Sequence, residues 1–158
     1  MSNVTITARE YHPESGALLG NVSVLDFGKI TAGTHSRVKV LDIAFDGVSS
    51  VGNIKIGLIS NGSIVVNEDP TGISSDGSAE NGHFGIESSS TFSGSKATSS
   101  LIRHFAGLNS NASADSVYNV SIGKKSDTIS NFIYLDIEIG SGNILAGNGA
   151  YKIFFDYS

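Results

Sequence analysis

The chain has 158 residues, the usual size of one domain, and carries a net charge of -5 at neutral pH. Its 10 Lys and Arg residues are scattered, which argues against nucleic-acid binding because phosphate contacts need clustered cations. The chain has no cysteine, which excludes disulfides and thiolate chemistry and fits assembly in a reducing cytoplasm. No run of about 18 apolar residues occurs, so we expect no membrane insertion.

The first half of the chain alternates apolar and polar residues in short segments, which is the pattern of β-strands. Candidate strands cover residues 4–8 and 22–27, and the clearest one runs from Arg37 to Phe45. Its two faces both carry apolar side chains, which are Val38, Val40 and Ala44 on one face and Leu41, Ile43 and Phe45 on the other. We therefore expect this strand to be covered on both sides.

The second half continues the pattern with a turn signal between two short strands. Residues 54–59 and 63–66 flank Asn61-Gly62, and because Asn-Gly is the strongest short hairpin signal we predict that they pair. Further candidate strands follow at 101–105, 117–122, 131–139 and 150–156. Across all the candidate strands we expect five residues to be buried, namely Val40, Ile133, Leu135, Ile137 and Phe154.

Together these segments predict an all-β fold with about nine strands. We expect a single antiparallel β-sandwich, Ig-like or jelly-roll-like, that forms one domain over residues 1–158.

One segment interrupts the strand pattern, since residues 72–100 are rich in Ser and Gly and hold few apolar residues. Loops of this length are uncommon in compact domains and are usually functional or disordered. We predict a long loop excursion from the sandwich whose apolar anchors Phe84, Ile86 and Phe92 bind a partner. A floppy surface loop with one short edge strand is the alternative interpretation of the same residues.

Residue sets for catalysis or metal binding are not recognisable in the sequence. The 4 histidines lack metal-ligand spacing, and no Gly-x-Ser-x-Gly turn marks a nucleophile. Asn67, Glu68 and Asp69 offer oxygen ligands, but their spacing differs from that of Ca²⁺-binding loops. Trp, the commonest aromatic platform for sugars, is absent. We expect no enzyme activity, no catalytic residues, no cofactor and no metal.

The segment from Leu25 to Ser36, LDFGKITAGTHS, places Asp-Phe-Gly and Gly-Thr turns directly before the strand at 37–45. This order resembles the opening of Ig-like β-sandwich modules of surface and particle-associated proteins. Together with residues 47–58, it is also similar to small virion structural proteins of tailed bacteriophages.

The resemblance implies a non-enzymatic capsid decoration protein, or a head or tail accessory subunit, that is located in the virion and assembled in the host cytoplasm. Its partners would be other virion proteins and further copies of itself in a homo-oligomer. The alternative is a carbohydrate- or cell-surface-binding β-sandwich module whose partner is a surface glycan. Solution mass separates the two, because a particle subunit should oligomerise whereas a sugar module is often a monomer.

Overall fold

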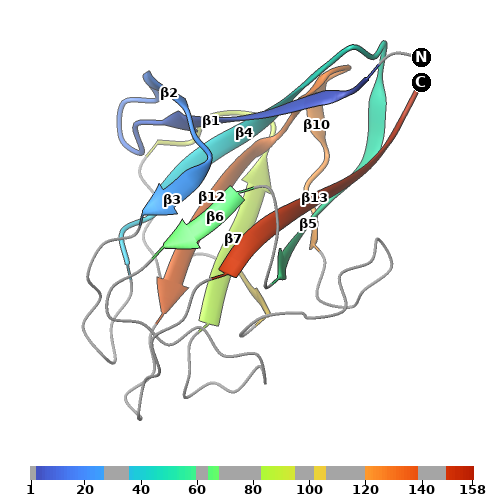
Figure 1. The fold of residues 1–158 in the computed structure, drawn as a ribbon. Helices are drawn as coiled ribbons and strands as arrows, with labels where there is room; N and C mark the ends of the chain where they lie inside the picture. Colours follow the sequence, from blue (N-terminus) through green and yellow to red (C-terminus); the bar gives the residue numbers. More distant parts are fainter. Residues whose placement is uncertain are drawn as a thin grey trace.

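The structure is a computed structural model that describes residues 3–26, 36–59, 64–67, 83–94, 102–105, 120–138 and 149–158. Within these residues thirteen β-strands form two sheets that pack together (Figure 1). The prediction of an all-β sandwich is confirmed. None of these residues forms a helix of the length and apolarity needed to cross a membrane.

The larger sheet has eight strands, with bounds β1 (Thr5–Tyr11), β2 (Leu18–Asn21), β4 (Lys39–Asp46), β7 (His83–Ser89), β8 (Ile102–Phe105), β10 (Lys124–Ser126), β11 (Ile129–Ser130) and β12 (Phe132–Glu138). Its order is β10-β11-β4-β12-β7-β8, and β1 pairs with β4 and carries β2 on its other side. All of these pairs are antiparallel.

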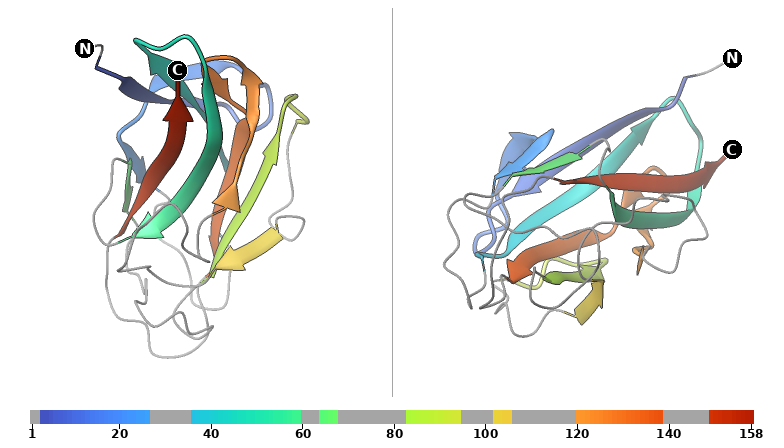
Figure 2. Two further views of the ribbon diagram at one scale, coloured as in Figure 1. Left: turned by 90° about the vertical axis from the view of Figure 1, so that its right-hand side faces the viewer. Right: turned by 60° about the horizontal axis from the view of Figure 1, so that its bottom comes forward.

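The smaller sheet has five strands, with bounds β3 (Val24–Asp26), β5 (Val51–Ile59), β6 (Ile64–Asn67), β9 (Val120–Ser121) and β13 (Gly149–Tyr157). Its order is β3-β6-β13-β5-β9. The pair of β3 and β6 is parallel, so the sandwich is not purely antiparallel. Figure 2 shows β13 beside β5 in one layer and β12 beside β7 in the other.

The predicted hairpin between the strands that flank Asn61-Gly62 is wrong. β13 lies between β5 and β6, and its Tyr151 is opposite Leu58 on one side and Ile64 on the other. An Asn-Gly turn specifies only the local chain reversal, so it does not prevent a third strand from pairing with both flanking strands. The turn itself lies outside the described residues.

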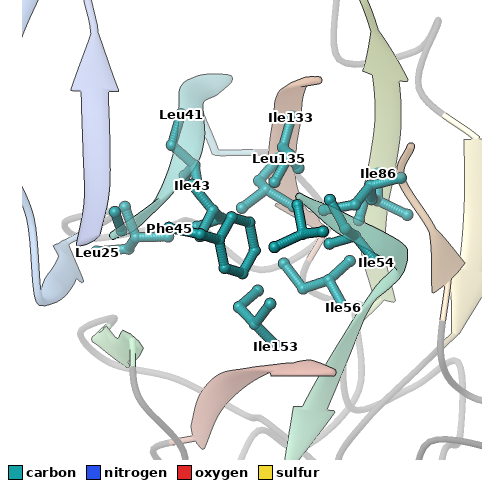
Figure 3. Close-up of a cluster of buried hydrophobic side chains, with 13 residues drawn as sticks. Leu25, Leu41, Ile43, Phe45, Ile54, Ile56, Ile86, Ile133, Leu135 and Ile153 are labelled. Carbon is teal, nitrogen blue, oxygen red and sulfur yellow. The ribbon is translucent and has the colours of Figure 1, made fainter. Parts of the chain in front are cut away.

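The core lies between the two sheets (Figure 3). β4 has buried side chains on both of its faces, one set in this core and the other in a second, smaller cluster. Leu41, Ile43 and Phe45 belong to the core, whereas Val40 packs on the face of the larger sheet turned away from the smaller sheet. We call this second face the outer face. The predicted burial of β4 on both sides is therefore confirmed, since Val40, Leu41, Asp42 and Ile43 are all fully buried.

Three of the five residues predicted to be buried, Val40, Ile133 and Leu135, are fully buried. The choice of Phe154 is wrong, because this residue is only half-buried. Its neighbours on β13 face the core instead: Ile153 is buried there, and the ring of Phe155 lies 4.7 Å from the ring of Phe45. The side chain of Ile137 lies outside the described residues.

The predicted loop excursion over residues 72–100 is wrong for residues 83–89, which form β7. This strand lies between β12 and β8 in the larger sheet, with Ile86 opposite Leu135. Apolar residues at alternate positions, Phe84 and Ile86, are enough for a strand, because its neighbours in the sheet supply the remaining contacts. Residues 72–82 and 95–100 lie outside the described residues.

Candidate partner-binding edge

The three residues predicted to bind a partner do not lie together on an exposed loop. Ile86 is fully buried in the core, so the prediction that it binds a partner is wrong. Phe84 is opposite Ile137 and Phe105 in the sheet, and its side chain lies outside the described residues. Phe92 is half-buried against its own chain.

Phe92 belongs to a short segment that lies on the outer face of the larger sheet. Its ring packs edge-on against Phe132, with the ring centroids 6.0 Å apart. The next residue, Ser93, bonds to the buried Tyr134: the backbone N–H donates to the phenol oxygen at 3.0 Å, and the two hydroxyl groups are 3.1 Å apart. These contacts fasten the segment to the sheet, so Phe92 stabilises the fold. Its predicted role toward a partner remains a prediction.

A buried carboxylate on the outer face joins three strands. Asp42 of β4 has no exposed side-chain surface, and it accepts two hydrogen bonds of 2.8 Å from the guanidinium of Arg9 on β1. The hydroxyl of Tyr11, also on β1, donates to Asp42 at 2.9 Å. Lys125 of β10 donates to the same carboxylate at 2.6 Å. The Lys125 ammonium also lies 3.3 Å from the centroid of the Phe132 ring.

The surroundings of Asp42 set the charge of the cluster. Burial is the largest influence on the pKa of Asp42 and by itself raises it, but the hydrogen bonds from Arg9, Lys125 and Tyr11 outweigh burial and lower the pKa. The hydrogen bond to Asp42 raises the pKa of Arg9. Burial and the hydrogen bond to Asp42 raise the pKa of Tyr11. Asp42 is therefore an anion held by two cations at neutral pH.

This arrangement ties three strands of the larger sheet together at Asp42. The bidentate Arg9 contact fixes β1 on β4, and the Lys125 contact fixes β10 at the same point. The cluster thus holds β1, the strand that carries β2, in a defined position.

β2 and β3 lie on the same side of the sandwich (Figure 1). Both strands carry exposed apolar side chains. Leu18 and Leu19 on β2 are 57% and 59% exposed, and Val24 on β3 is 46% exposed. Among the residues that the structure describes, only one other large apolar side chain is this exposed, Tyr157 at the end of β13. We call Leu18, Leu19 and Val24 the apolar edge.

A small cavity of about 180 Å³ adjoins the apolar edge. Its walls include apolar groups of Tyr11, Pro13, Leu19 and Val38, and charged groups of Glu10, Arg37 and Lys39. Glu10 and Lys39 form an ion pair of 3.3 Å. Pockets for organic ligands usually measure roughly 300–1,000 Å³, so this cavity suits a single side chain better than a whole small molecule.

Sequence reasoning missed both the apolar edge and the Asp42 cluster. The adjacent pair Leu18-Leu19, between the polar segments around Ser15 and Asn21, was a signal that could have revealed the edge, because alternation places only one of two neighbours on a covered face. No such signal existed for the cluster, since Asp42 lies 33 and 83 positions from Arg9 and Lys125.

The described residues contain no group of three or more His, Cys, Asp and Glu side chains arranged to hold a metal ion. Comparisons with known proteins give no relative: no family model, no curated protein and no solved structure matches the chain. The resemblance to virion proteins therefore remains a prediction.

Proposed function

We propose that this chain is a non-enzymatic structural subunit of a virion, of the capsid decoration or head/tail accessory type, that binds neighbouring subunits. The observation that carries the binding role is the exposure of the apolar edge, where Leu18 and Leu19 on one strand are each more than half exposed and Val24 on the next strand is 46% exposed, because exposed apolar side chains mark interaction surfaces where they gather. The particle itself is inferred from the similarity of residues 25–58 to small virion proteins.

The position of the apolar edge in the sheet supports a contact with another protein. A strand at the edge of a sheet presents unpaired backbone N–H and C=O groups, and natural proteins often protect such an edge with charged side chains or proline. β2, with the sequence LLGN, contains neither, but it is only four residues long and has a bulge at Leu19, and both features limit the pairing of a further strand. Its exposed leucines therefore suit contact with an apolar surface of a partner better than the addition of a strand.

Rigid support of β1 strengthens the proposal. A binding surface that is already ordered loses little conformational entropy when a partner arrives. The bidentate contact of Arg9 with Asp42 and the bond from Tyr11 fix the strand that carries β2. The hydrogen bonds of the buried cluster therefore hold β1 in place, and β2 with it.

The glycan-binding alternative has weaker support. The cavity beside β2 includes an aromatic ring, Tyr11, but its volume of about 180 Å³ is small for a sugar residue with its substituents. The Tyr11 hydroxyl is moreover bonded to Asp42 and is thereby withdrawn from ligand recognition.

Protein analysis of purified particles tests the proposal. We expect quantitative mass spectrometry of particles that carry this coding sequence to find the chain at a fixed ratio to the major shell or tube protein, after washing in high salt. A chain that is absent from such particles but binds immobilised glycans would overturn the proposal in favour of the sugar-binding module.

A further inference from the structure

We propose that the cavity beside β2 binds one apolar side chain, of the size of leucine or phenylalanine, from a partner protein in which an acidic residue follows that side chain. Arg37 at the cavity pairs with the acidic residue. The inference rests on the proposed function for the partner being a neighbouring subunit. It deepens that function by naming what the partner presents and which residues receive it.

The first argument is the size and chemistry of the cavity. Its apolar wall is formed by four side chains, Tyr11, Pro13, Leu19 and Val38. Leu19 and Arg37 line the cavity and are themselves exposed, so it opens to the surface. Its volume is about 180 Å³, and an apolar cavity of about 150 Å³ is enough to bind benzene. One branched or aromatic side chain therefore fits, and its burial removes apolar surface of both partners from water.

The second argument is that the inner wall of the cavity is fixed before any partner arrives. Val38 is buried in the cluster of the outer face. The ring of Tyr11 packs edge-on against Phe132, with the ring centroids 5.2 Å apart, and its hydroxyl donates to Asp42 at 2.9 Å. Because this wall is already ordered, little conformational entropy is lost when a side chain enters.

The third argument is the charge of the cavity. The cavity has three charged side chains, and two of them, Glu10 and Lys39, pair with each other at 3.3 Å. The third, Arg37, is exposed, and within the described part of the chain its guanidinium forms no ion pair. An apolar wall beside an unpaired cation is complementary to an apolar side chain beside a carboxylate.

The charges around the cavity favour the same partner. Seven charged side chains belong to the cavity, the Asp42 cluster and the turn between β1 and β2, with four positive (Arg9, Arg37, Lys39 and Lys125) and three negative (Glu10, Glu14 and Asp42). The next acidic residue of β4, Asp46, is opposite Thr5 at the far end of β1. The whole chain has a net charge of -5, so this region attracts a carboxylate that most of the surface repels.

The size of the contact sets its affinity. A short peptide that buries one side chain and forms one exposed ion pair should have a dissociation constant of about 1 mM. The ion pair itself should change the affinity by no more than about fivefold, because exposed pairs contribute little. A neighbouring subunit binds more tightly than the peptide, since it also covers the apolar edge and many copies act together in a particle.

Titration of the isotope-labelled chain with short peptides, followed by NMR, tests the inference. The capped peptide Gly-Leu-Asp-Gly should shift the backbone amide signals of Tyr11, Leu19 and Val38 in a saturable way. Gly-Leu-Asn-Gly, which lacks only the charge, should bind about two- to fivefold more weakly. Gly-Ala-Asp-Gly, which lacks the large side chain, should cause no saturable shift up to ~10 mM.

Two variants of the chain isolate the role of Arg37. Arg37→Gln should bind the Asp peptide as weakly as the Asn peptide and should leave the affinity for the Asn peptide unchanged. Lys124→Gln is the matched control, because it also removes one positive charge, but Lys124 contacts Ser50 and Asp127 and does not line the cavity. This control should bind both peptides as wild type does. The unfolding midpoint of each variant is measured to confirm folding, which the exposure of Arg37 favours.

Three results would overturn the inference. The first is that the Asp peptide causes no saturable shift up to ~10 mM. The second is equal binding of the Asp and Asn peptides, or an equal loss in Arg37→Gln and Lys124→Gln, because the acidic residue would then not be recognised at Arg37. The third is that glucose shifts the amide signals of the cavity residues and the peptides do not, since the cavity would then be a sugar site.

The particle analysis separates this inference from the proposed function. A chain that is present in particles but does not bind the Asp peptide overturns the assignment of the cavity and leaves the proposed function standing. A chain that binds the Asp peptide through Arg37 but is absent from particles supports the assignment of the cavity and overturns the role in a virion.

Discussion

Gly16 lies directly against the ring of Phe92. A Cβ atom placed on Gly16 would be 3.0 Å from the Cδ1 atom of that ring, and Gly16 has a φ of +75°. Gly16 belongs to the turn between β1 and β2, so Phe92 supports the turn that leads into the apolar edge. Phe92, which the sequence predicted to bind a partner, thus supports the turn before the apolar edge from within its own chain.

Gly16→Ala should therefore lower the free energy of unfolding in two ways. The positive φ costs an alanine about 1 kcal/mol, and crowding against Phe92 adds about 1–3 kcal/mol. Urea unfolding measures the sum. Gly94→Ala is the matched control, because Gly94 has a φ of +77° and no atom within 4 Å of an added Cβ. Equal losses for the two variants would show that the Phe92 contact is unimportant.

Asp42→Asn should destabilise the fold by roughly 3 kcal/mol at neutral pH, near the lower end for a broken buried ion pair because Arg9 and Lys125 retain some exposure. The amide leaves two cations without a neutralising anion. Asp127→Asn is the control, since Asp127 pairs with Lys124 at 3.6 Å but is 81% exposed. That exposed pair should contribute less than about 1 kcal/mol. Similar unfolding midpoints for the two variants would contradict the structural role of the cluster.

Acid should remove the contribution of Asp42. Its pKa is lower in the folded chain than the ordinary value, so the stabilisation is complete above about pH 4 and is lost as the pH falls through the folded pKa. Unfolding measured between neutral pH and about pH 2 should therefore show the gap between wild type and Asp42→Asn closing on acidification. A gap that stays constant over this range would mean that Asp42 is not ionised in the folded chain.

Leu135→Ala should lower the free energy of unfolding by about 2–5 kcal/mol, because Leu135 is fully buried in the core (Figure 3). Leu18→Ala makes the same chemical change at a side chain that is 57% exposed. We expect this control to change the free energy of unfolding by no more than about 0.5 kcal/mol at concentrations where the chain is monomeric. A comparable loss for Leu18→Ala would show that β2 is covered in the monomer.

Local patterns predicted the strands and their faces where neighbours along the chain determine them. The alternation in β4 predicted that Leu41, Ile43 and Phe45 share one face and that Val38 and Val40 share the other, and the structure confirms both. In β13 the same reasoning chose the wrong face at Phe154. Apolar residues occur there at consecutive positions, and a register shift follows between Phe154 and Asp156, so alternation alone does not identify the buried face.

Relations between distant parts of the chain could not be predicted in this way. Nothing in the residues around β5 and β6 indicates that β13 separates them, and nothing near Asp42 indicates Arg9 or Lys125. The candidate edge is a similar case. Leu18 is exposed because β1 is the only described strand that pairs with β2. That arrangement is determined by the whole sheet and not by the residues around Leu18.

The place of β13 has a consequence for how the chain folds. β5 and β6 both require β13 as their neighbour, and the pair Ala150 and Ile59 is separated by most of the chain. The smaller sheet therefore cannot close by local hairpins and must wait for a large loop to form, at a cost in chain entropy that precedes any gain from pairing. Proteins dominated by such distant contacts fold in roughly milliseconds to seconds rather than microseconds. During that interval β5 and β6 lack their shared partner, and unpaired strand edges of this kind are where chains of several copies pair wrongly.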